Sequence, residues 1–408
     1  MRLRPAFRRI GSLSRMKTRM RKPLFVVLLV MIGAAGAALA YAPYLPQLVT
    51  EGYPPLTWPA RGHFAQIDGT DPPLPLALGH HAARDALPSD LERLFTESDG
   101  KALLVYRTGT LELEHYGEGI SSQTKLNSYS IAKSLVGALI FKALAEGKIE
   151  SLDAPIGDIL PATRDPALRL VSLRALLEMR SGVVFGAAGE IFGDENGAKD
   201  IEAGRINPFG PKARLHFLGL SSIQTSLTAG QVKAAPFSYQ NINTALLGLL
   251  LETLYRRPLS ALLAEKIWRP AGAGIAHWRQ SAGGDISAYC CIYATARDWI
   301  RVGLFLTRNG TPADPFLPEP MWRELMGLGL DTAALRQGVY GYHIRHDMLD
   351  RAGEPLQGSF AYMMGMGGQL LYLMPQRDLV VFRAGERMPL LHTTLYAAWK
   401  AIGEPPRR

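Results

Sequence analysis

Residues 127–140 read Asn-Ser-Tyr-Ser-Ile-Ala-Lys-Ser-Leu-Val-Gly-Ala-Leu-Ile, a polar segment that passes into an apolar helical run. Within it, Ser130 and Lys133 stand three residues apart, and positions i and i+3 share one face of a helix. The Lys133 amine can therefore reach the Ser130 hydroxyl. A lysine in apolar surroundings favours its neutral form, which can accept the proton of a serine. The pattern predicts a serine nucleophile that is activated by a lysine.

The spacing alone is not decisive, because the chain holds four Ser-x-x-Lys matches, at Ser14/Lys17, Ser98/Lys101, Ser122/Lys125 and Ser130/Lys133. The first lies in a basic leader, the second contains Asp-Gly, and the third is embedded in polar residues without helical periodicity. Only the fourth opens a helix, because apolar residues recur at helical spacing from Ile131 to Leu144 before Gly147 ends the run. Taken alone, the tetrapeptide also fits a helix-starting serine and a lysine whose stem covers apolar surface.

The excess positive charge lies entirely at the N-terminus. The formal net charge is +9, and residues 1–22 carry nine basic residues and no acidic one. The rest of the chain holds 36 basic and 36 acidic residues and is electrically balanced. A basic face for nucleic acid is therefore not indicated, and we expect no nucleic-acid partner.

Nineteen apolar or small residues follow the basic leader, from Leu24 to Ala42, and no charge stands between Lys22 and Glu51. A helix needs about 20 residues to cross a bilayer, whereas the apolar core of a signal peptide has about 7 to 15. We expect residues 1–23 to be a cytoplasmic leader and residues 24–42 a single-pass anchor in the lipid bilayer of the inner membrane, with the body in the periplasm. The alternative is a signal peptide with its cleavage site at residues 38–40, followed by secretion.

Eight prolines between Pro43 and Pro75 predict an extended segment, so residues 43–85 are interpreted as a linker or a wrapping arm. The remaining residues, 86–408, are numerous enough for a large core, in a chain with 47% hydrophobic residues. We expect them to form one two-lobed domain.

Strand patterns gather at the two ends of this domain. Residues 101–118 have the alternation of a β-hairpin, and strands are predicted at 339–345, 369–374 and 378–383. Helical spacing recurs between them, at 134–146, 172–179, 243–256, 258–267 and 296–307, and Thr295-Ala-Arg-Asp298 resembles a capping box. Strands from both ends around a helical middle indicate an α+β fold, an antiparallel sheet flanked by helices with a mostly helical lobe.

Two further segments carry groups that are suited to catalysis. Phe237-Ser-Tyr-Gln-Asn-Ile-Asn243 precedes an apolar helix, where Tyr239 is placed to shuttle a proton and Asn241 to orient a substrate. Gly365-Met-Gly-Gly-Gln369 leads into a strand, where a backbone amide suits an oxyanion hole. Taken alone, the first segment also fits a helix cap and the second an ordinary glycine turn.

The only two cysteines, Cys290 and Cys291, are adjacent. Consecutive Cα atoms lie about 3.8 Å apart, less than the 4.4 Å or more of ordinary disulfides. We therefore expect two buried thiols. No metal site is predicted, because these cysteines have no obvious histidine partners.

Taken in order, these elements resemble the serine β-lactamase and penicillin-binding-protein superfamily, whose motifs include Ser-x-x-Lys, Ser-Asp-Asn and Lys-Thr-Gly. The chain is most similar to the class C β-lactamase-like branch, whose second element is Tyr-x-Asn, and within it to 6-aminohexanoate-dimer hydrolase-type serine hydrolases. The resemblance covers about residues 95–400 and extends to the stretches 147–161, 172–182 and 289–298. It implies a β-lactamase/transpeptidase-like fold.

The resemblance also implies roles for individual residues. Ser130 would be the nucleophile, Lys133 its general base, and Tyr239 the group that relays protons to the leaving group and later activates water. The backbone amides of Ser130 and Gln369 would form the oxyanion hole, and Asn241 matches the asparagine of Tyr-x-Asn. The implied reaction is cleavage of a small-molecule ester or amide through an acyl-serine intermediate, without a cofactor.

The third element departs from the family pattern, because Met366, Gly367 and Gly368 stand in place of Lys-Thr-Gly or His-x-Gly. Methionine supplies no cation for the carboxylate of a β-lactam or of a peptidoglycan stem peptide. Met363, Met364 and Met366 either line an apolar cleft or belong to the core. Three functions stay open: an ester or amide hydrolase, a peptidoglycan-directed carboxypeptidase or β-lactamase, and a non-catalytic binding or scaffold protein. The joint presence of Ser130, Lys133 and Tyr239 favours the hydrolase.

Overall fold

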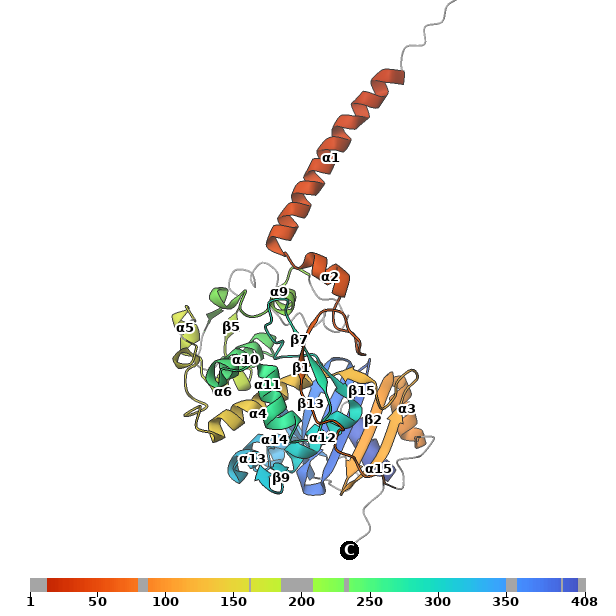
Figure 1. Cartoon of the computed structure of the whole chain (residues 1–408), viewed down its shortest axis with the longest axis vertical. Coiled ribbons are helices and arrows are strands. Elements are labelled where there is room, and N and C mark those ends of the chain that lie inside the picture. Colours follow the sequence, from red (N-terminus) through yellow and green to blue (C-terminus); the bar gives the residue numbers. More distant parts are fainter. Residues whose placement is uncertain are drawn as a thin grey trace, which may run out of the picture. The chain divides into compact units, whose positions relative to one another are not determined.

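A computed structural model of the chain describes residues 13–79, 87–160, 163–184, 208–230, 235–349, 358–389 and 392–402, with side chains from residue 25 onward. The chain divides into two units, residues 1–50 and residues 51–408. The first unit contains helix α1 (Leu13–Tyr41) and most of helix α2 (Leu45–Glu51) (Figure 1).

The apolar N-terminal segment is helical but is interrupted. Within the described residues, no one helix has both the length and the apolar character of a membrane span. The helical segments Phe25–Tyr41 and Leu45–Glu51 reach the required length and apolar character only when they are taken together, and they are bent by 85° relative to each other. The straight transmembrane helix expected over residues 24–42 is therefore not supported, because the helix breaks after Tyr41.

A seven-stranded antiparallel sheet forms the centre of the second unit. Its order is β11 (Val339–Gly341), β12 (Ile344–Leu349), β13 (Gly358–Gly365), β14 (Gln369–Met374), β15 (Leu379–Gly385), β2 (Gly100–Arg107) and β3 (Thr110–Tyr116). Strands from the two ends of the sequence meet where β15 pairs with β2. The α+β fold with an antiparallel sheet is confirmed.

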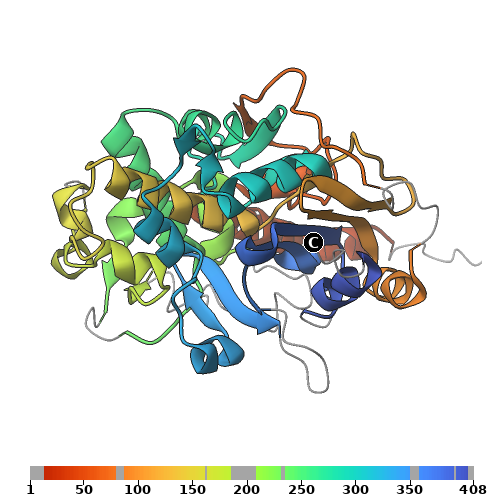
Figure 2. The same ribbon diagram turned by 90° about the horizontal axis from the view of Figure 1, so that it is seen from below.

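Side chains alternate between the two faces of this sheet, as the period of a strand requires. Ala361 and Met363 pack on the face that carries α4 (Ile131–Ala145) and α12 (Ala296–Thr307), whereas Phe360 and Tyr362 pack on the face of α3 (Ser89–Glu97) and α15 (Thr393–Ile402). Figure 2 shows the teal helix α12 on one side of the strands, and the orange α3 and blue α15 on the other. The sheet is thus a middle layer between helices.

The helices of the middle of the sequence gather beside this sheet as a second lobe (Figure 1). They include α5 (Pro166–Arg169), α6 (Leu173–Leu177), α9 (Pro211–Leu218), α10 (Asn241–Tyr255), α11 (Leu259–Leu263) with its continuation Ala264–Trp268, α13 (Glu319–Leu325) and α14 (Thr332–Gln337). The short elements are the strands β5 (Val183–Val184), β6 (Thr228–Ala229), β9 (Gly310–Thr311) and β10 (Asp314–Pro315), and the 3-10 turns η1 (Ile156–Asp158), η2 (Gln224–Ser226), η4 (Met366–Gly368) and η5 (Pro375–Arg377).

Most predicted elements occur where the sequence places them. The hairpin at 101–118 and the strands near 369–374 and 378–383 are confirmed, and both hydrogen bonds of the capping box between Thr295 and Asp298 are present. The single strand predicted over 339–345 is wrong. The chain turns back at Tyr342 and His343, whose φ angles are 59° and 64°, so this segment forms the hairpin β11–β12.

A second sheet incorporates part of the proline-rich segment. Its order is β1 (His63–Ile67), β7 (Ala276–Gln280), β8 (Ile292–Thr295) and β4 (Lys125–Asn127). Residues 51–79, called the wrapping arm below, contribute β1 as the edge strand of this sheet, and the second unit begins at Glu51. Strand β4 matters for the site, because it ends three residues before Ser130.

Candidate active site

Ser130 occupies the turn between β4 and α4, and this turn is tied to β8. The Ser128 N–H donates to the Ile292 carbonyl at 2.8 Å, and the Ile292 N–H donates to the Ser128 hydroxyl at 3.0 Å. Tyr129 has a left-handed φ of 44°, and its carbonyl accepts the Cys291 N–H at 3.2 Å. The backbone that presents Ser130 is thus held by hydrogen bonds to a neighbouring strand.

Lys133 lies one turn further along α4 and is 1% exposed. Its Nζ atom is 3.2 Å from the Ser130 Oγ atom, and it donates to Asn241 Oδ1 at 2.7 Å and to the Tyr289 carbonyl oxygen at 2.9 Å. A neutral amine has two hydrogens and one lone pair, whereas an ammonium has three hydrogens. The Asn241 and Tyr289 oxygens can only accept hydrogen bonds, so they take two of the hydrogens on Nζ, and the third position of Nζ faces the Ser130 hydroxyl. In the neutral form of the amine this third position holds the lone pair, which is the arrangement that a general base requires.

Tyr239 completes the group that the sequence predicts. It is half-buried just before α10, and the Lys133 Nζ atom lies 4.9 Å from the centre of its ring. Asn241 begins α10, so one short segment supplies both residues. The structure thus brings together Ser130, Lys133, Tyr239 and Asn241 from two separate parts of the sequence.

Tyr340 and His343 border this group, and sequence reasoning missed both. The ring of Tyr340 is edge-on to Tyr239 at 6.1 Å, and burial, with a smaller contribution from Tyr239, raises the pKa of Tyr340. Burial, helped by the nearby charge of Lys133, lowers the pKa of His343 to about 3, so this imidazole is neutral at pH 7. The His343 Nδ1 atom is 3.3 Å from the Tyr340 hydroxyl. Both residues come from the β11–β12 hairpin, which the sequence pattern did not reveal.

The segment from Gly365 to Gln369 forms the turn between β13 and β14 and lies against the serine. A Cβ atom added at Gly365 would collide with the Ser128 carbonyl oxygen and would stand 3.2 Å from the Ser130 nitrogen and 3.1 Å from the Gln369 Cβ atom. Gly367 and Gly368 have left-handed φ angles of 74° and 79°. The predicted turn is therefore beside the nucleophile, and Gly365 joins the candidate residues because only a glycine fits this contact.

The side chains of Gln369 and Met366, both predicted as site residues of this turn, differ in exposure. The Gln369 side chain is buried, and its Nε2 atom donates to the Met366 and Gly385 carbonyl oxygens, each at 2.7 Å. Met366 is 46% exposed, whereas Met363 is in the core and Met364 packs on the opposite face of the sheet. Of the three methionines, Met366 is the one placed to meet a substrate.

Cys290 and Cys291 lie beside the site and form a disulfide with each other. The expectation of two buried thiols is wrong. Cys291 adopts a left-handed φ of 74°, a backbone kink that brings the adjacent side chains together. The pair directly follows Tyr289, whose carbonyl accepts a hydrogen bond from Lys133. The N–H of Cys291 itself donates to the Tyr129 carbonyl.

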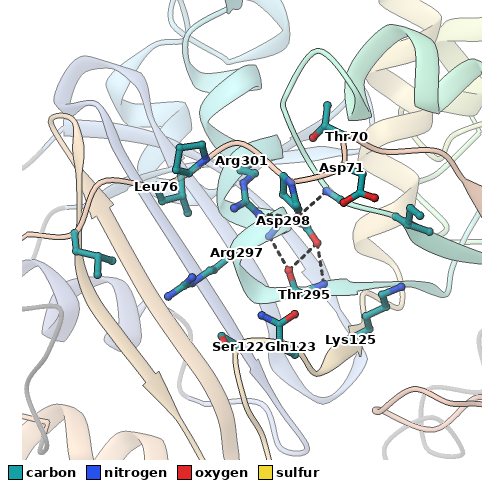
Figure 3. A pocket seen from close by; sticks show the side chains of 15 residues that line it. Thr70, Asp71, Leu76, Ser122, Gln123, Lys125, Thr295, Arg297, Asp298 and Arg301 are labelled. Atoms are coloured by element: carbon teal, nitrogen blue, oxygen red, sulfur yellow. Dashed lines mark hydrogen bonds and ion pairs between the residues drawn. The ribbon is translucent and has the colours of Figure 1, made fainter.

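A polar cavity of about 490 Å³ lies between the wrapping arm and α12 (Figure 3), and Ser130 is not among the residues that line it. Its polar groups largely bind each other. Asp298 accepts hydrogen bonds from the Gly274 N–H, the Thr295 hydroxyl and Arg301, and Lys125 is hydrogen-bonded to His277. We interpret this cavity as a structural junction. In the described part of the chain, no group of three His, Cys, Asp or Glu side chains is placed to hold a metal ion.

A Ser-x-x-Lys pair at the start of a buried helix, facing a glycine turn of a helix-flanked antiparallel sheet, defines the β-lactamase/transpeptidase class of α+β proteins. The beta-lactamase family model matches residues 89–399, and the chain belongs to this family of serine hydrolases.

Solved structures with the same fold are distant in sequence. A protein described as a 6-aminohexanoate-dimer hydrolase from Bacillus anthracis has a TM-score of 0.66 and 18% identity, covering 84% of this chain and 89% of its own. A D-stereospecific amidohydrolase from a Streptomyces species gives 0.55 and 17%, covering 79% and 99%. A class C beta lactamase from Rhodobacter sphaeroides gives 0.51 and 14%, covering 76% and 98%. No curated protein matches the sequence.

The contact between Gly365 and the serine turn predicts the effect of one added methyl group. Gly365→Ala should slow covalent labelling of Ser130 by a fluorophosphonate about a hundredfold, because the turn must move away from the nucleophile. It should lower stability by about 1 to 3 kcal/mol. Gly329→Ala is the control, because its added Cβ meets open space and should change neither value. Unaltered labelling of a folded Gly365→Ala protein would contradict the described contact.

Proposed function

We propose that the protein hydrolyses an ester or amide bond of a small molecule through an acyl-serine intermediate. The observation that carries this proposal is the position of Lys133, whose Nζ atom is 3.2 Å from the Ser130 hydroxyl and is bonded to two carbonyl acceptors on its other sides. A lysine that served only to cover apolar surface would not need a serine hydroxyl 3.2 Å away. Membership of the beta-lactamase family supports the same conclusion.

In the proposed reaction, the Ser130 oxygen attacks the substrate carbonyl while Lys133 takes the hydroxyl proton. The negative charge that develops on the carbonyl oxygen is stabilised by the Ser130 N–H and by an N–H of the Gly365–Gln369 turn, which offers those of Met366 and Gln369. Tyr239 relays a proton to the leaving amine or alcohol as the old bond breaks. Water, deprotonated through Tyr239, then attacks the acyl-serine and releases the acid.

The substrate class follows from the exposed side chains near the nucleophile. Met366 and Phe237, which are 46% and 43% exposed, are apolar, and Phe237 packs on Tyr340 beside Tyr239. A methionine offers polarisable, adaptable contact but no charge. We therefore favour a substrate without a carboxylate next to the scissile bond. Two structural neighbours are named for amide or dimer hydrolysis, which supports testing linear amides as well as esters.

We further propose that residues 24–42 tether the protein to the inner membrane, with the hydrolase unit on the periplasmic side. The support comes from the nine basic residues before this segment and from its exposed apolar side chains, including Phe25 and Ile32. A tethered hydrolase would meet substrates that cross or line the cell envelope.

A fluorophosphonate should add covalently to Ser130 of the full-length protein, as detected by peptide mass spectrometry. Lys133→Ala should slow this labelling by about 10²- to 10⁴-fold, the usual contribution of a general base. Lys142→Ala is a matched control, because Lys142 is on the same helix but contacts Phe316 and Glu146 instead. Absence of an adduct in a folded protein would favour the non-catalytic binding or scaffold alternative.

A fluorescent penicillin should label the wild-type protein poorly, because Met366 stands where the family has a cation for the carboxylate. Met366→Lys should increase the rate of this labelling about tenfold or more, since hydrogen bonds to charged groups contribute about 1.5 to 3 kcal/mol. Fast labelling of the wild type would instead support the peptidoglycan-directed alternative.

The tether predicts that alkaline carbonate will leave the full-length protein in the membrane fraction, because an apolar segment of about 20 residues is not extracted by disrupting charges. Intact mass should then show residues 24–42 still attached. A soluble protein whose N-terminus lies just after residue 40 would identify a cleaved signal peptide.

A further inference from the structure

Arg383 lies behind the glycine turn, on the opposite side of the sheet from Ser130. It is on β15, is 1% exposed, and by strand alternation belongs to the face that carries α3 and α15. Its Nη1 atom donates to the Gly367 and Gly368 carbonyl oxygens at 2.9 and 2.6 Å. Its Nη2 atom donates to the Ser98 carbonyl and hydroxyl oxygens at 2.6 and 2.8 Å. One guanidinium thus joins the tip of the turn to the end of α3.

Two glycines shape the space around this guanidinium. A Cβ atom added at Gly368 would collide with the Arg383 Nη1 atom, and one added at Gly385 would collide with Nη2. The guanidinium therefore occupies a slot that depends on the absence of side chains on both sides. A slot of this kind constrains the turn to a single position relative to Arg383.

The hydrogen bond to Gly368 also sets the direction of an amide. In a trans peptide the C=O and the following N–H point in opposite directions. Because the Gly368 carbonyl points at Arg383, the Gln369 N–H of the same peptide points away from Arg383. The Gln369 side chain adds a second restraint from the front, through its bonds to Met366 and Gly385.

The charge of Arg383 is met by three backbone oxygens and the Ser98 hydroxyl. No carboxylate forms an ion pair with it among the residues that the structure describes. Burial lowers the pKa of Arg383 to about 10, so it remains charged at pH 7. Burying a charge carries a large desolvation cost, which an apolar side chain would avoid. This cost is consistent with a role that needs several strong, directed donors at one place.

We propose that Arg383 is a positioning residue that holds the Gly365–Gln369 turn, and with it the oxyanion-binding amide, in place for the reaction at Ser130. The inference rests on the proposed hydrolase function. Arg383 itself does not touch the substrate, because the sheet separates it from the nucleophile. Its removal should reduce stabilisation of the tetrahedral intermediate while leaving the substrate-contacting side chains unchanged.

The test compares Arg383→Met and Arg383→Lys with the wild-type, full-length protein, using p-nitrophenyl butyrate as the probe. Arg383→Met should lower kcat about a hundredfold while KM changes less than about threefold, because displaced oxyanion donors act on the transition state. The kcat of Arg383→Lys should lie between those of the wild type and Arg383→Met, because one ammonium cannot reproduce the paired donors of a guanidinium. The control is Arg107→Met, because Arg107 is also buried in this sheet but donates to the Ile402 carbonyl. We expect its kcat to be unchanged.

Hydrogen exchange of the same proteins, measured on the peptide that spans residues 365–369, separates the possible outcomes. Faster exchange there together with the loss of kcat supports the proposal. Unchanged exchange, or faster exchange with normal kcat, overturns it. A wild-type protein that neither hydrolyses the probe nor reacts with a fluorophosphonate defeats the proposed hydrolase function instead. In that case, faster exchange in Arg383→Lys, the milder variant, would still show that Arg383 holds the turn. Unchanged exchange would refute the proposed role of Arg383 in addition to the hydrolase function.

Discussion

The buried amine of Lys133 is the constraint on which the site depends. An amine without water must find hydrogen-bond partners within the protein, and those of Lys133 come from the start of α4, the start of α10 and the loop before β8. Asn241 and Tyr289 lie 108 and 156 residues beyond Lys133 in the sequence. Satisfying one side chain therefore fixes the approach of the helical lobe to the second sheet, and it places Tyr239 and Asn241 beside the nucleophile at the same time.

A second constraint acts on the backbone. The serine turn (residues 128–130) and the glycine turn (residues 365–369) approach so closely that Gly365 has no room for a Cβ atom. The serine turn is also bonded to β8 through Ser128. The two N–H-bearing segments of the proposed oxyanion site thus meet through main-chain contacts, while side-chain hydrogen bonds of Ser128, Gln369 and Arg383 hold each segment in place. Because the proposed oxyanion donors are backbone groups, Met366 can replace the family's cation without altering the donors themselves.

Much of this arrangement could be predicted from the sequence, and the limits have physical causes. The apolar periodicity of α4 and the capping box at Thr295 are local signals, and both appear where expected. The turn at Tyr342 and His343 has no such signal, because a tyrosine seldom adopts a positive φ and the chain has no glycine at either position. Tertiary contacts that the sequence does not reveal contribute there, including the bond from the His343 N–H to the Leu177 carbonyl. The Cys290–Cys291 disulfide was missed because the distance rule for ordinary disulfides does not describe adjacent residues.

The placement of positive charge around the glycine turn separates catalysis from specificity. In the family pattern, a cation in the third motif faces the substrate, whereas here that position is the neutral Met366. The charge nearest to the turn belongs to Arg383, which is bound to Gly367, Gly368 and Ser98 on the opposite face. A charged hydrogen bond contributes about 1.5 to 3 kcal/mol, which is roughly a 10- to 150-fold difference in binding. Without a cation on the substrate side of the turn, binding of substrates with a carboxylate is disfavoured. A charge behind the turn can still serve the chemistry that all acyl substrates share.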